Sequence, residues 1–193
     1  MKRVTTCMVG LAIGFLGGVP AWSSNGSGAE AWVRAWNQDG GTGTCTVFKM
    51  LRDPAGNLLV AGDQTDTNGV RSQVLWKVNP SGREQWRVEE PIELANEDGW
   101  RAFEVDSQGA SLVTGTGGTV KYGADGRKLW ESAYAGRALA VDSTDHVIVA
   151  GFSEQDWSLA KISPDGTNVW SRLEKPPRPG AVATSAVVTV NSA

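Results

Sequence analysis

Side chains able to perform chemistry are scarce in this sequence. Its 193 residues include one histidine, His146, and two cysteines, Cys7 and Cys45. A catalytic triad needs a nucleophile, a histidine and an orienting acid, and a zinc site needs several nitrogen or sulfur ligands. With one histidine and no cluster of ligands, the sequence predicts no catalytic residues, no metal site and no cofactor.

Tryptophan and lysine, in contrast, recur at fixed spacing. A glycine lies four residues before, and a lysine nine residues before, each of Trp86, Trp130 and Trp170. These tryptophans would suit stacking on sugars or on a flat cofactor, but their regular recurrence favours packing between neighbouring sheets. The lysines are Lys77, Lys121 and Lys161. A cationic site is one interpretation of them, and we favour lysines that are either solvated or packed along their stems.

A second landmark also occurs three times. An aspartate follows a short apolar segment at Asp53, Asp106 and Asp142, and a glycine comes nine residues after each, at Gly62, Gly115 and Gly151. Aspartate can close a turn by bonding its own backbone two residues on. An arginine lies five residues before two of these aspartates, at Arg101 and Arg137.

The segments between the landmarks have the pattern of short strands. Residues 137–142 place Leu139 and Val141 on one face by alternation, and a turn and the run Val147–Gly151 follow. Ser163–Gly166 has the proline and glycine of a tight turn. Four strands in 40–44 residues are the unit of a β-propeller blade. The sequence therefore predicts an all-β protein of four-stranded antiparallel blades at about 46–88, 99–134 and 136–173.

The repeats resemble a known family over most of residues 31–191, most strongly from Trp100 to Trp170. Residues 120–136, 138–143 and 147–151 are similar to the bacterial extracellular β-propeller repeat of the seven-bladed type, whose pattern is roughly AIAVDSxGNVYVTG followed by DYATVKYDxxGxxLWxxxYxG. The segment Asp156–Ile162 is similar to the DYATVKY stretch. More distantly, the repeats resemble pyrroloquinoline-quinone propellers. The family implies a propeller whose first strands line a central channel, which would place Arg101 and Arg137 near one mouth, to bind an anionic or polar ligand or to pair with acidic neighbours.

The blade count predicts an incomplete ring. Beyond the three blades, residues 31–36 resemble a lone fourth strand and residues 185–191 a lone first strand. A propeller normally has four to eight blades. Three alternatives remain open: a truncated gene product, a ring completed by homo-oligomerisation through open strand edges, and an open arc or compressed closure of three blades.

The first 23 residues have the form of a secretory signal peptide. The basic residues Lys2 and Arg3 precede the uncharged apolar stretch Met8–Val19, and small residues suited to cleavage follow that stretch. Residues 24–30 are then expected to form a linker. The stretch is too short for the alternative, a membrane anchor. Cleavage would leave Cys45 without a partner, as a buried small side chain. We therefore expect a secreted, periplasmic or cell-surface protein with no membrane span after cleavage.

Composition and repeats together favour a binding or structural scaffold. A net charge of −3 argues against nucleic-acid binding by phosphate neutralisation. The expected partner is an extracellular protein or a glycan, which would meet the loops at one channel mouth. The alternative is a fragment or relative of a propeller enzyme, such as a quinoprotein-like dehydrogenase or a lyase.

Overall fold

The protein is described here by a computed structural model. It describes residues 8–9, 34–35, 44–92, 99–153 and 156–175. Most of the expected signal peptide and linker, and all of the expected strand at 185–191, lie outside the described residues. Of the expected strand at 31–36, only Arg34–Ala35 is described; it forms β2 and pairs with β1 (Met8–Val9).

The described part of the chain is all β, with three four-stranded antiparallel sheets and no helix. The first sheet consists of β3 (Thr44–Arg52), β4 (Leu58–Thr65), β5 (Arg71–Val78) and β6 (Glu84–Pro91). The second consists of β7 (Trp100–Val105), β8 (Ser111–Gly115), β9 (Gly118–Tyr122) and β10 (Lys128–Ser132). The third consists of β11 (Ala138–Val141), β12 (Val147–Ser153), β13 (Asp156–Ile162) and β14 (Asn168–Glu174).

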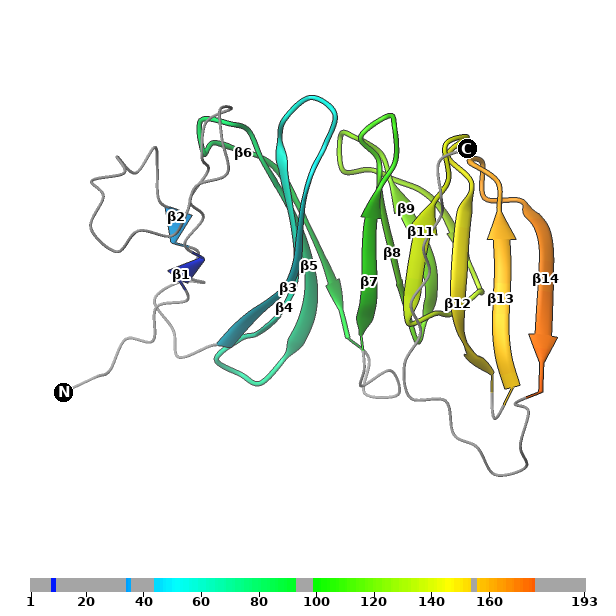
Figure 1. The fold of residues 1–193 in the computed structure, drawn as a ribbon. Helices are drawn as coiled ribbons and strands as arrows, with labels where there is room; N and C mark the ends of the chain where they lie inside the picture. Colours follow the sequence, from blue (N-terminus) through cyan, green and yellow to red (C-terminus); the bar gives the residue numbers. More distant parts are fainter. Residues whose placement is uncertain (1–7, 10–33, 36–43, 93–98, 154–155, 176–193) are drawn as a thin grey trace, which may run out of the picture.

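Each sheet is a simple meander in which every strand pairs with the next one along the chain. The three sheets follow one another across the molecule in chain order (Figure 1). Their first strands β3, β7 and β11 are neighbours, because β7 contacts both of the others. Successive sheets therefore meet face to face, and no sheet closes on itself as a barrel.

Tight turns of the same kind join the strands of each sheet. The turns between first and second strands begin at the recurring aspartates, and the turns between third and fourth strands contain Gly82, Gly126 and Gly166, each with a positive φ. These turns are four-residue loops in which the N–H of the fourth residue donates to the carbonyl of the first at 2.9–3.1 Å. The recurring Gly62, Gly115 and Gly151 lie on second strands, where a Cβ would overlap the backbone of the preceding strand or of the segment before it.

The buried apolar residues form three clusters. Leu59, Ala61 and Leu75 of the first sheet pack against Phe103, Val113 and Tyr122 of the second. Leu112 of the second sheet packs against Leu139, Val147, Val149 and Ile162 of the third. A third cluster (Val60, Val74, Trp76 and Val78) lies on the opposite face of the first sheet. The apolar faces between sheets therefore fix the order in which the sheets stack.

Candidate functional site

The recurring aspartates organise the turn that follows each first strand. Asp53 Oδ1 accepts the backbone N–H of Asn57 at 2.7 Å, and Asp106 Oδ1 accepts that of Ala110 at 2.8 Å. Asp142 Oδ1 accepts the N–H of His146 at 3.0 Å. One carboxylate oxygen thus closes each turn, which leaves the second oxygen to contact another element.

That second oxygen binds the recurring lysine of the third strand. The Nζ–Oδ2 distances are 2.9 Å for Lys77–Asp53, 2.8 Å for Lys121–Asp106 and 2.8 Å for Lys161–Asp142. Lys77 and Lys121 are buried, with side chains 4% and 7% exposed, whereas the Lys161 side chain is 26% exposed. The expectation of solvated lysines is therefore wrong for Lys77 and Lys121, because each neutralises a buried carboxylate in its own sheet.

The partners of these aspartates control their ionisation. Burial by itself would raise the pKa of Asp53, but hydrogen bonds from Asn57 and Lys77 outweigh it and lower that pKa. At Asp142 the bonds from Lys161 and Thr144 likewise outweigh burial and hold its pKa well below the ordinary value. Both carboxylates therefore stay ionised at neutral pH and act as fixed anions.

The tryptophans and lysines of one sheet together bind the next sheet. Trp86 Nε1 and Lys77 Nζ both donate to the carbonyl of Ala124, at 2.8 and 3.1 Å. One sheet further on, Trp130 Nε1 and Lys121 Nζ both donate to the carbonyl of Pro164, at 2.9 and 3.3 Å. We call this arrangement of one lysine and one tryptophan on the carbonyl of the following sheet the Lys–Trp clamp.

Glycine at the end of the same turn lets the indole ring approach. A Cβ on Gly126 would lie 2.8 Å from the Trp86 ring, and a Cβ on Gly166 would lie 2.8 Å from the Trp130 ring. Both glycines also have a positive φ, of 83° and 91°. The glycines four residues before Trp130 and before Trp170 therefore receive the tryptophan of the preceding sheet, so at these two places the two recurring residues form one inter-sheet contact.

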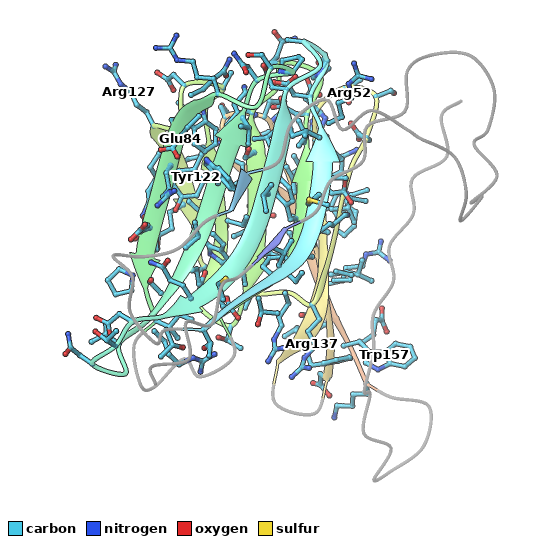
Figure 2. All side chains as sticks on the ribbon, turned by 90° about the vertical axis from the view of Figure 1, so that its left-hand side faces the viewer. Arg52, Glu84, Tyr122, Arg127, Arg137 and Trp157 are labelled. Carbon is cyan, nitrogen blue, oxygen red and sulfur yellow. The ribbon has the colours of Figure 1, made fainter. Side chains whose placement is uncertain are left out.

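The turns after the first strands line a cleft at one end of the molecule. Residues 52–56, together with Val105 and Asp106, surround a volume of about 500 Å³. Figure 2 shows Arg52 at the same end as Arg127 and opposite Arg137 and Trp157. Because Lys77 and Lys121 neutralise Asp53 and Asp106, the guanidinium of Arg52 is the group in this lining that can offer charge to a ligand.

Arg101 and Arg137 belong to equivalent places in the second and third sheets. Arg137 precedes β11, and its guanidinium lies 6.0 Å from the centre of the Phe152 ring. Arg101 lies on β7, where its positive charge acts on Asp63. Burial raises the pKa of Asp63, and the positive charges of Arg71 and Arg101 oppose that rise. Both arginines are exposed. Their role in ligand binding stays a prediction.

Other chemically capable residues take part in local structure. His146 Nδ1 lies 2.8 Å from Thr144 Oγ1 within the turn that begins at Asp142. Cys45 is disulfide-bonded in this structure, whereas a free Cys45 is expected if cleavage removes Cys7. Within the described ranges, no group of three or more histidine, cysteine or acidic residues could hold a metal ion. The same part of the chain has no helix long and apolar enough to cross a membrane.

Sequence reasoning separately identified the aspartates and the lysines but missed that they pair. The signal was available, because each series occurs once per unit. The separation of aspartate and lysine varies from 15 to 24 residues along the chain, however, because the second and third strands and the loops between them differ in length. A fixed spacing is therefore a poor guide to this pair, and membership of the same unit is a better one.

Comparisons with known proteins give little further information. No family model matches the chain, and no curated protein sequence matches it. A solved structure of a protein of unknown function from Bacteroides caccae matches with a TM-score of 0.48 and 18% identity. The match covers 74% of this chain and 50% of that one, so the chain spans about half the length of its structural neighbour.

Proposed function

We propose that this protein is a secreted, non-enzymatic β-propeller repeat scaffold that binds an extracellular protein or glycan. Three antiparallel four-stranded sheets stacked face to face, with their first strands adjacent, are consistent with consecutive propeller blades. The observation that carries the proposal is the Lys–Trp clamp. In this clamp, recurring tryptophans and lysines hold neighbouring sheets together, which supports a structural role for them and not a catalytic one.

A scaffold held in this way presents its loops at two ends. Binding residues commonly lie on loops that a rigid framework positions. The cleft beside Arg52 is the candidate at one end, and Arg137 is the candidate at the other. Arg101, near the start of β7, holds the equivalent place in the second sheet. All three side chains are guanidinium groups, which suit carboxylate, sulfate or phosphate groups on a glycan or on an acidic protein surface.

Export is part of the same proposal. The basic start and the apolar stretch Met8–Val19 support delivery to the periplasm, the cell surface or the medium. Cell fractionation and N-terminal sequencing of the recovered protein test it. Recovery from the cytoplasm with residues 1–23 intact would contradict export.

The binding proposal is tested by screening the purified protein against an array of extracellular glycans and surface proteins. We expect a specific ligand whose affinity falls with Arg52→Ala, or with the double substitution Arg101→Ala and Arg137→Ala, which identifies the end in use. Arg127→Ala, an exposed arginine in a third-to-fourth strand turn, is the matched control. Absorbance of a bound redox cofactor together with turnover would contradict a non-enzymatic role.

A further inference from the structure

A second pocket lies between the second and third sheets and shares no lining residue with the cleft beside Arg52. It encloses about 280 Å³ between the segment that follows β10 and the strands β13 and β14. Pockets that hold drug-sized ligands have volumes of about 300–1,000 Å³, so this one suits a smaller molecule. The side chains that give it chemical character are Tyr134, Ser158, Ser171 and Leu173.

Three of these side chains bring hydroxyl groups from three different segments. Tyr134 Oη donates to Ser171 Oγ at 3.3 Å. Ser158 Oγ faces the segment that carries Tyr134, because it and the carbonyl of Ala135 both lie within 3.4 Å of where a Cβ on Gly151 would be. Ser171 accepts the phenol's bond, so its own hydroxyl hydrogen is available, and no described residue bonds the hydroxyl of Ser158. The pocket therefore has hydrogen-bond donors and acceptors to offer to a ligand.

The segment that carries Tyr134 is held in place from behind. Thr119 Oγ1 donates to the carbonyl of Tyr134 at 2.6 Å, and Thr114 Oγ1 lies 2.8 Å from Thr119 Oγ1, with both threonines fully buried. The N–H of Gly136 donates to the carbonyl of Gly115 at 3.2 Å. The Tyr134 ring also packs against the apolar cluster between the second and third sheets. Binding here would thus order few side chains, which lowers the entropy that a small ligand must overcome.

The pocket offers no positive charge to a ligand. In the part of the chain that the structure describes, Arg172 is its one charged lining residue. Arg172 follows Ser171 directly on β14, and successive side chains of a strand point to opposite faces of the sheet. Its guanidinium therefore belongs to the other face, and the groups that line the pocket are hydroxyls, an aromatic ring and aliphatic side chains.

The equivalent place between the first and second sheets has the opposite character. Glu90 follows Trp86 by four residues, as Tyr134 follows Trp130. Glu131 follows its tryptophan directly, as Ser171 does in the next sheet. Lys128 Nζ lies 3.4 Å from a carboxylate oxygen of both glutamates. Ion pairs thus occupy this place between the first two sheets, and neutral hydroxyls line it between the second and third.

We propose that the pocket binds one neutral monosaccharide unit of a glycan, an inference that rests on the proposed binding function and names its ligand. A sugar ring can exchange hydrogen bonds with Tyr134, Ser158 and Ser171, while its C–H groups pack on the Tyr134 ring and on Leu173, which is 64% exposed. An acidic sugar is disfavoured, because its carboxylate would lose water with no cation to replace it.

The position of the pocket connects it with Arg137. Phe152 lines the pocket, and its ring centre lies 6.0 Å from the guanidinium of Arg137. Arg137 lies at the end of the molecule opposite Arg52 (Figure 2). A glycan longer than one unit would therefore continue from the pocket toward that end.

NMR titration of the full protein tests the proposal with four probes, the methyl glycosides of glucose, galactose, mannose and N-acetylglucosamine. We expect at least one of them to shift the ring signals of Tyr134, with a dissociation constant of about 1 mM. Tyr134→Phe and Ser171→Ala each remove one hydroxyl and should weaken that binding by about 3–10-fold without lowering the melting temperature much. Ser143→Ala, at an exposed serine in the turn after β11, is the matched control and should bind as the unchanged protein does.

Two further probes define the ligand class. Glycerol at the same concentration should not shift the Tyr134 signals, and equal shifts would show a site for any polyol and overturn the sugar proposal. Tighter binding of methyl glucuronide than of methyl glucoside would contradict the neutral lining, and no shift with any of the four neutral probes would overturn the pocket. The broader binding function fails separately. A glycan whose binding depends on Arg52 or Arg137 but not on Tyr134 or Ser171 would refute the pocket alone, whereas no glycan or surface protein bound at all would refute the scaffold's binding role.

Discussion

Replacing the same lysine in two sheets should have very different effects on stability. Lys121→Met leaves Asp106, whose side chain is fully buried, as an uncompensated carboxylate. Breaking a buried pair from one side costs about 3–5 kcal/mol. Lys161→Met removes the equivalent pair where both side chains reach solvent, at 26% and 13% exposure, and should cost about 1 kcal/mol or less.

Urea unfolding followed by circular dichroism measures both costs. With an m value of about 2 kcal/mol/M, Lys121→Met should lower the midpoint by about 1.5–2.5 M and Lys161→Met by about 0.5 M or less. Adding Asp106→Asn to Lys121→Met should recover most of the loss, because the carboxylate is then absent. Equal midpoint shifts for the two lysines would refute this account of the buried pairs.

Four further outcomes follow from the structure. Gly166→Ala should lower the melting temperature more than Gly69→Ala, since both have a positive φ but only Gly166 has an indole against its Cβ position; equal losses would exclude the contact. Asp142 has a lowered pKa when folded, so it stabilises above its unfolded pKa near 3.8; Asp142→Asn should therefore destabilise at pH 7, and the difference in melting temperature should shrink as the pH falls below that value. Asp63 has a raised pKa when folded, so Asp63→Asn should stabilise at pH 7 and have no effect well below pH 3.8; destabilisation at pH 7 would contradict this sign. The exported protein should show one reactive thiol, Cys45, after denaturation, because cleavage removes Cys7; a count of zero would contradict cleavage.

The sequence predicts the all-β class and the strand-rich repeat well, because period-two alternation and turn residues are local signals. The turn at Asp142 is local in the same way, since its partners lie within four residues. Burial of Lys77 and Lys121 is not local. It depends on a carboxylate two strands away and on a carbonyl of the next sheet, and neither has a constant separation in sequence.

The cleft beside Arg52 also escapes sequence reasoning, for a related reason. Its lining comes from turns of two different sheets, and only stacking brings them together. The spacing of glycine and tryptophan within one unit suggests that these two residues contact each other locally. The glycine that packs on Trp86, however, is Gly126 of the following unit. Residues that recur together in one repeat thus contact each other between repeats.

The central claim is that the Lys–Trp clamps join successive sheets. Proton NMR of the protein with assigned glycine and tryptophan signals tests it most directly, because a ring current shifts protons that lie against an indole. We predict upfield-shifted α protons for Gly126 and Gly166, with nuclear Overhauser effects to the rings of Trp86 and Trp130. Gly69, which has no atom within 4 Å of its Cβ position, should keep ordinary shifts. Ordinary shifts at Gly126 and Gly166, with no effects to these two rings, would contradict the account.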